Sequence, residues 1–188
     1  REAASLPPEV LAALLELLCA SLPPRCEKLA LELLRLTDGL LGTAVFVMDS
    51  VAASASPRVV CLSLLFADRL LAWLARPEAE PFRARLVDGA APVVTTACCR
   101  LLATSPMAQD RQVCSALSVL WLSMCRLLPG TMQDALSRCA SDICVSKQEL
   151  ELLAQQMADP MVSEDSFAEA LCDTAGSWQA ERLKRALG

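Results

Sequence analysis

Cysteine is the residue type with the most chemistry open to it in this chain of 188 residues, because the sequence contains ten cysteines and no histidine or tyrosine. A cysteine nucleophile needs a neighbouring base, which is most often histidine. Without histidine the base must be a carboxylate or one of the lysines Lys28, Lys147 and Lys184, and each lysine lies in a pattern typical of a solvated helix face. We therefore expect no enzyme, and we keep a cysteine-nucleophile enzyme as a remote alternative. The cysteines lie at positions 19, 26, 61, 98, 99, 114, 125, 139, 144 and 172.

The spacing of these cysteines does not suit a structural zinc site, which takes pairs of ligands a few residues apart at two places. Cys98 and Cys99 are adjacent, so they point to different sides of a helix, and Cys139 and Cys144 diverge in the same way. The six glycines fall singly, without the clustering of a phosphate-binding loop. We expect no metal and no cofactor.

The surroundings of the cysteines indicate a reduced compartment. Each lies among leucine, alanine or valine in a helical pattern, where a thiol behaves as a small buried apolar group. A domain of this size does not need disulfides to hold a core. We therefore expect an intracellular protein, either nuclear or cytoplasmic. The longest uncharged stretches, residues 89–99 and 112–125, are shorter than the ~20 apolar residues of a membrane span, so we expect no membrane insertion.

Charge argues against nucleic acid as the main ligand, because a net charge of −5 opposes attraction to phosphates. Arginine and tryptophan are enriched at protein interfaces, and one stretch gathers both. We predict a partner-binding site there, made by Arg69, Trp73, Arg76, Arg83 and Arg85.

The last third of the chain is acidic, and its carboxylates have two interpretations. Near helix starts they complement the helix dipole. Alternatively, they form an acidic surface that meets a basic partner peptide. The residues concerned are Glu149, Glu151, Asp159, Glu164, Asp165, Glu169 and Asp173.

The elements that carry these residues are predicted to be helices, because apolar residues recur at intervals of three and four and no strand pattern has a partner. Proline pairs, Gly39 and Pro129-Gly130 separate the helices, and Ser146 with Glu149 forms a capping-box pattern that starts one of them. A loop with one helical turn at 82–87 is predicted over 78–89. Helices are predicted over residues 8–20, 23–39, 40–53, 57–76, 91–104, 108–128, 131–144, 147–159, 163–174 and 177–187.

Three apolar patterns predict which helix faces are buried. Trp178, Leu183 and Leu187 are predicted to lie on one side of the last helix. The first helix is predicted to bury Val10, Leu11, Leu14, Leu15 and Leu18. The helix over 108–128 is predicted to be the most buried, through Val113, Leu117, Leu120, Trp121, Met124 and Leu128.

The fold class that follows is all-α, with about ten antiparallel helices in one domain over residues 1–188. Helix pairs recur about every 35 to 45 residues, which is similar to HEAT and armadillo arrays and implies a fragment of an α-solenoid. An irregular helical bundle gives the same pattern. Because the chain opens on Arg1, we expect it to be part of a longer chain.

The function predicted from these features is a non-catalytic scaffold or adaptor domain that binds other proteins, and also its own copies, as a subunit of a larger complex. A stacked array leaves apolar end faces that other chains must cover. The alternative is a regulatory bundle that holds an amphipathic peptide or an apolar ligand in a groove. The residues predicted to line that groove are Met48, Phe66, Met107, Trp121 and Met124.

Overall fold

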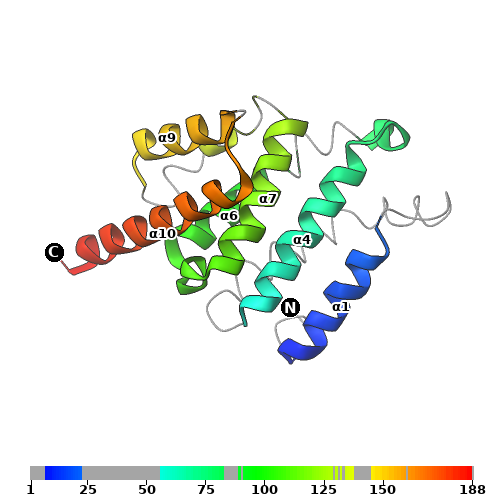
Figure 1. Ribbon diagram of the computed structural model, residues 1–188, viewed down its shortest axis with the longest axis horizontal. Helices are drawn as coiled ribbons and strands as arrows, with labels where there is room; N and C mark the ends of the chain where they lie inside the picture. Colours follow the sequence, from blue (N-terminus) through cyan, green and yellow to red (C-terminus); the bar gives the residue numbers. More distant parts are fainter. Residues whose placement is uncertain are drawn as a thin grey trace.

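The computed structural model describes residues 7–22, 56–82, 89, 91–128, 130, 132, 134–137, 145–159 and 161–187, and within these ranges it contains helices and no strand (Figure 1). The all-α class is confirmed for this part of the chain. The predicted helices 23–39 and 40–53, and most of 131–144, lie outside it. The elements are α1 (Pro8–Ala20), α4 (Pro57–Leu74), η3 (Pro77–Phe82), α6 (Ala91–Thr104), η5 (Pro106–Gln109), α7 (Arg111–Leu127), α9 (Lys147–Ala158) and α10 (Glu164–Leu187), where η marks a short 3₁₀ helix.

Helix starts follow local chemistry that the sequence displays. Pro8 occupies the first turn of α1, where the missing N–H of proline costs nothing. The capping box before α9 is confirmed: Ser146 Oγ accepts a hydrogen bond from the Glu149 N–H at 3.2 Å, and the Glu149 carboxylate accepts one from the Ser146 N–H at 3.0 Å.

The predicted helix over 108–128 is divided in the structure. The Asp110 side chain accepts a hydrogen bond from the Gln112 N–H at 2.8 Å and caps α7, while the residues before it form η5. The predicted loop after α4 likewise begins as the 3₁₀ helix η3. Both differences arise because side-chain and backbone hydrogen bonds stabilise short turns that apolar periodicity does not reveal.

Helix α7 lies at the centre of the described bundle. It packs against α4 and against α10, while α1 covers α4 and α6 contacts α10. The ring of Trp121 lies 6.4 Å from that of Phe167 on α10, centroid to centroid. The predicted burial of this helix is confirmed for Val113, Leu117, Leu120, Trp121, Met124 and Leu128.

This arrangement is a helical bundle around one central helix. The solenoid interpretation and the count of about ten helices remain predictions, because two of the predicted helices fall outside the described residues. The buried face of α1 is confirmed only in part: Leu11 and Leu15 are buried, whereas Val10 and Leu14 are exposed.

Helix α10 corrects the prediction of two short helices over 163–174 and 177–187. It runs without a break through Gly176 and Ser177. Phe167, Leu171 and Trp178 are buried along one stripe that spans the glycine, so tertiary packing outweighs the cost of about 1 kcal/mol that glycine adds to a helix interior.

The end of α10 corrects a second prediction. Trp178 is buried, but Leu183 and Leu187 are 61% and 80% exposed. The three side chains therefore do not form one buried face of the helix. Every residue from 180 to 187 is exposed, and Figure 1 shows this stretch extending beyond the other helices. We call residues 180–187 the C-terminal arm.

Gly176 and Gly130 provide a matched test of the backbone. A Cβ at Gly176 would meet no atom within 4 Å, so Gly176→Ala should raise the free energy of unfolding by about 0.5–1 kcal/mol through helix propensity. Gly130 has a φ of 93°, which a side chain disfavours, so Gly130→Ala should lower it by about 1–2 kcal/mol. Urea unfolding measures both changes. A loss of stability in Gly176→Ala would contradict the continuous α10.

Candidate functional site

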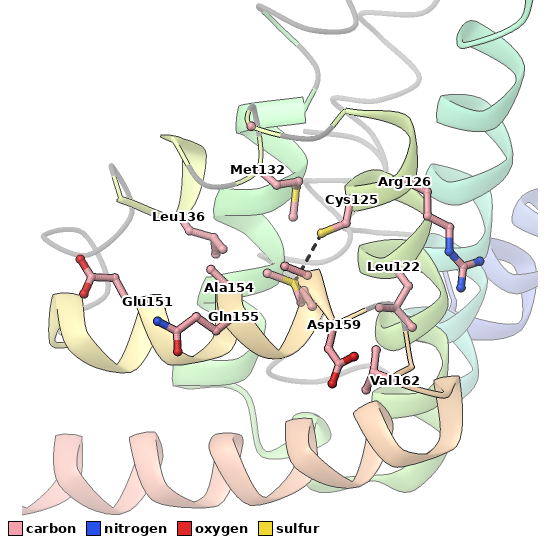
Figure 2. Close-up of a pocket in the computed structure, with 13 residues that line it drawn as sticks. Leu122, Cys125, Arg126, Met132, Leu136, Glu151, Ala154, Gln155, Asp159 and Val162 are labelled. Carbon is pink, nitrogen blue, oxygen red and sulfur yellow. Dashed lines mark hydrogen bonds between the residues drawn. The ribbon is translucent and has the colours of Figure 1, made fainter.

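A pocket of about 630 Å³ lies between the C-terminal half of α7, the helix α9 and the residues that follow each of them (Figure 2). This volume is within the range of protein sites that bind small ligands or side chains of a partner. Its lining residues are Leu122, Cys125, Arg126, Gly130, Met132, Leu136, Glu151, Ala154, Gln155, Met157, Ala158, Asp159 and Val162.

The sequence of α9 explains why a space remains beside α7. Leu153 and Met157 are buried and fix α9 against the rest of the bundle. Ala154 and Ala158 lie one turn apart on the pocket side, and their methyl groups do not fill the gap between the helices. The left-handed backbone of Gly130 lets the chain turn just beyond α7, so that Met132 returns to the pocket wall.

The floor of the pocket is apolar and deformable. Leu122, Met132, Leu136 and Met157 are buried, and the two methionines have flexible thioether side chains. Cys125 Sγ donates a weak hydrogen bond to Met157 Sδ at 3.9 Å, the dashed line in Figure 2. Burial raises the pKa of the Cys125 thiol, so it is neutral near pH 7 and adds to the apolar surface.

The rim of the pocket is polar. Arg126, Glu151, Gln155 and Asp159 are exposed lining residues from α7, α9 and the turn after α9. The Asp159 carboxylate accepts a hydrogen bond from the Met161 N–H at 2.9 Å, which fixes its position. Two carboxylates and one guanidinium therefore surround an apolar interior, which can orient a ligand that carries cationic groups.

The predicted partner-binding residues lie away from this pocket, and their described members have structural contacts. Arg69 donates a hydrogen bond from Nη1 to the Cys19 carbonyl at 2.8 Å, which connects α4 to the end of α1. Trp73 is 5% exposed and belongs to the core, whereas Arg76 is exposed just after α4. Arg83 and Arg85 lie outside the described residues.

The residues predicted to line a groove do not line the pocket. Phe66, Trp121 and Met124 are buried in the core, Met107 is half-buried and packs against it, and Met48 lies outside the described residues. Two other methionines, Met132 and Met157, line the pocket. The signal that was missed is the pair Ala154 and Ala158, whose spacing leaves one side of a helix without bulk.

Among the described residues, Cys19, Cys61 and Cys114 lie in surroundings that disfavour the thiolate. Burial raises the pKa of Cys19, of Cys61 to about 11, and of Cys114, whereas a nucleophilic cysteine needs a lowered pKa. Cys114 Sγ donates a hydrogen bond to the Ala108 carbonyl at 3.0 Å. These thiols therefore act as packing groups. The seven cysteines among the described residues form no disulfide, and these residues contain no cluster of three candidate metal ligands.

Asp68 on α4 is a further candidate for acid or base chemistry, because its carboxylate is partly buried. Burial raises its pKa, which outweighs the lowering by a hydrogen bond from Ser123 and by the charge of Arg69. Its Oδ1 atom is buried without a hydrogen-bond partner. Asp68 does not line the pocket, so we assign it no role in binding.

We found no match to this chain among protein-family models, curated proteins or solved structures. Across the helices that the structure describes, none combines the length and apolar character needed to cross a membrane.

The raised pKa of Asp68 predicts a pH dependence of stability. The folded state holds this proton more tightly than the unfolded state, whose pKa is near 3.8, so stability should fall as pH rises through the folded-state pKa. Asp68→Asn should reduce this fall and raise the urea midpoint at pH 7 relative to the original chain. Unfolding curves between about pH 4 and pH 7 measure it. Asp173→Asn, which removes an exposed carboxylate of α10, controls for the loss of one charge.

Proposed function

We propose that this chain is a non-catalytic protein-interaction domain whose pocket binds one face of an amphipathic helix from a partner. The observation that carries the proposal is the pocket of about 630 Å³ with an apolar floor and a polar rim. The raised pKa values of the buried thiols support a role in binding rather than in covalent catalysis.

The shape of the rim favours a helix as the occupant. Glu151, Gln155 and Ala158 follow one edge of the pocket at intervals of four and three residues, so this edge is about 10 Å long at the rise of an α-helix. Two turns of a helix have the same length, and they present apolar side chains at positions i and i+4. Such a pair matches the apolar floor.

The charges of the rim favour a helix that carries cations. Glu151 and Asp159 outnumber Arg126 among the charged lining residues. Opposite charges around an apolar contact increase the rate of association and select the orientation of the partner. This develops the hypothesis of an acidic surface that receives a basic peptide.

We further propose a wider role as an intracellular scaffold or adaptor within a larger complex, with an arrangement related to HEAT or armadillo arrays. The apolar content of 54% supports this role. So does α1, where Val10, Leu14 and Leu17 form an exposed apolar face at helical spacing. Such a face is available for contacts in addition to the pocket.

Binding is tested with a fluorescein-labelled amphipathic peptide of leucine and lysine, about five helical turns long. Its anisotropy should rise to saturation with the chain. Ala158→Arg introduces a long cation at an exposed position of the pocket and should weaken binding by about tenfold or more.

Gln156→Arg is the matched control, because Gln156 is exposed on the same helix and does not line the pocket. It adds the same charge and should change the affinity little. Equal weakening by both variants would attribute the binding to general attraction of charge and would contradict the pocket as the site. A peptide of the same composition with a scrambled order should bind poorly.

A further inference from the structure

The C-terminal arm has the chemistry that the pocket requires. Leu183 and Leu187 are one helical turn apart and 61% and 80% exposed. They are the i and i+4 apolar pair that the pocket floor would accommodate. Isolated helical segments as short as the arm are marginal in water, so the arm gains most from packing against another surface.

The arm and the pocket rim have opposite net charge. Arg182, Lys184 and Arg185 give the arm a positive charge that exceeds the single negative charge of Glu181. Arg185 Nε donates to Glu181 Oε1 at 3.4 Å, which orients that pair along the arm. The rim carries Glu151 and Asp159 against Arg126, so the charges of the two surfaces are complementary.

The arm cannot reach the pocket of its own chain. Val162 lines the pocket, and α10 begins at Glu164 and continues without a break to Leu187. At about 1.5 Å per residue, Leu183 lies about 30 Å from Val162 along the helix. Docking within one chain would require α10 to break, with loss of the buried stripe around Trp178.

We infer that the pocket binds the C-terminal arm of a second copy of this chain, with Leu183 and Leu187 on its apolar floor. This inference rests on the proposed function, because it names the amphipathic helix that the pocket receives. The contact joins two different surfaces, so it is heterologous. It links copies head to tail, or it closes as a reciprocal pair in which each arm enters the other pocket.

The test measures self-association of the full chain by sedimentation at several protein concentrations. Leu183→Glu, at an exposed position of the arm, and Ala158→Arg, in the pocket, should each raise the concentration of half-association by about tenfold or more. Leu152→Glu is the control for the arm, because Leu152 is a leucine of similar exposure, 59%, and does not line the pocket. Gln156→Arg again controls for the pocket. Neither control should change self-association.

A mixture of the two disrupted variants provides the decisive measurement. The Leu183→Glu chain retains an intact pocket and the Ala158→Arg chain retains an intact arm, so an equimolar mixture should form a one-to-one complex at a concentration where neither variant associates alone. Recovery in the mixture also shows that both variants are folded. A mixture that stays monomeric overturns the inference, as does equal loss of association in Leu152→Glu.

The result separates this inference from the proposed function. If the chain stays monomeric at every concentration while the leucine and lysine peptide still binds in a manner sensitive to Ala158→Arg, the arm is not the occupant and the pocket remains a helix-binding site. If the peptide does not bind and Ala158→Arg changes nothing, the proposed function itself is overturned.

Discussion

The burial of α7 between α4 and α10 is the interaction on which the rest of the described structure depends. Trp121 is fully buried, and the centroid of its ring lies 6.4 Å from that of Phe167. The same contact fixes the direction of α10, and therefore where its end points. The C-terminal half of α7 also supplies Leu122, Cys125 and Arg126 to the pocket. One packed helix thus positions both the pocket and the projecting end of α10.

This packing is strong enough to tolerate polar atoms that are not satisfied. Among the described residues, Trp121 Nε1 and Asp68 Oδ1 are buried without a hydrogen-bond partner. Each such group costs about 1–3 kcal/mol. A large aromatic side chain in a well-packed core contributes about 3–5 kcal/mol, judged by its removal, so Trp121 stabilises the fold on balance. The buried thiols add to the same core, which explains how a chain rich in cysteine can use that residue type for packing.

Sequence reasoning succeeded where local rules decide the structure. The bounds of α1 and α6, the capping box before α9 and the buried stripe of α7 all follow from prolines, caps and apolar spacing within one helix.

Sequence reasoning failed where contacts between distant segments decide the structure. The two short helices predicted over 163–174 and 177–187 are one helix, because Phe167 and Trp178 pack on either side of the predicted gap. The residue type of Trp73 does not separate a core side chain from an exposed one, and in the structure this side chain is 5% exposed. The pocket depends on how α9 lies across α7, which no single helix pattern contains.

The unbroken course of α10 has a consequence for anything that uses both of its ends. Its 24 residues extend about 36 Å at the rise of an α-helix, and no proline interrupts them. The helix therefore begins beside the pocket and holds Leu183 and Leu187 at a fixed distance and a fixed rotation from it. The distance and the rotation between the two ends of α10 are decided by residue count, so inserting or deleting one residue in α10 would turn the far end by about 100°.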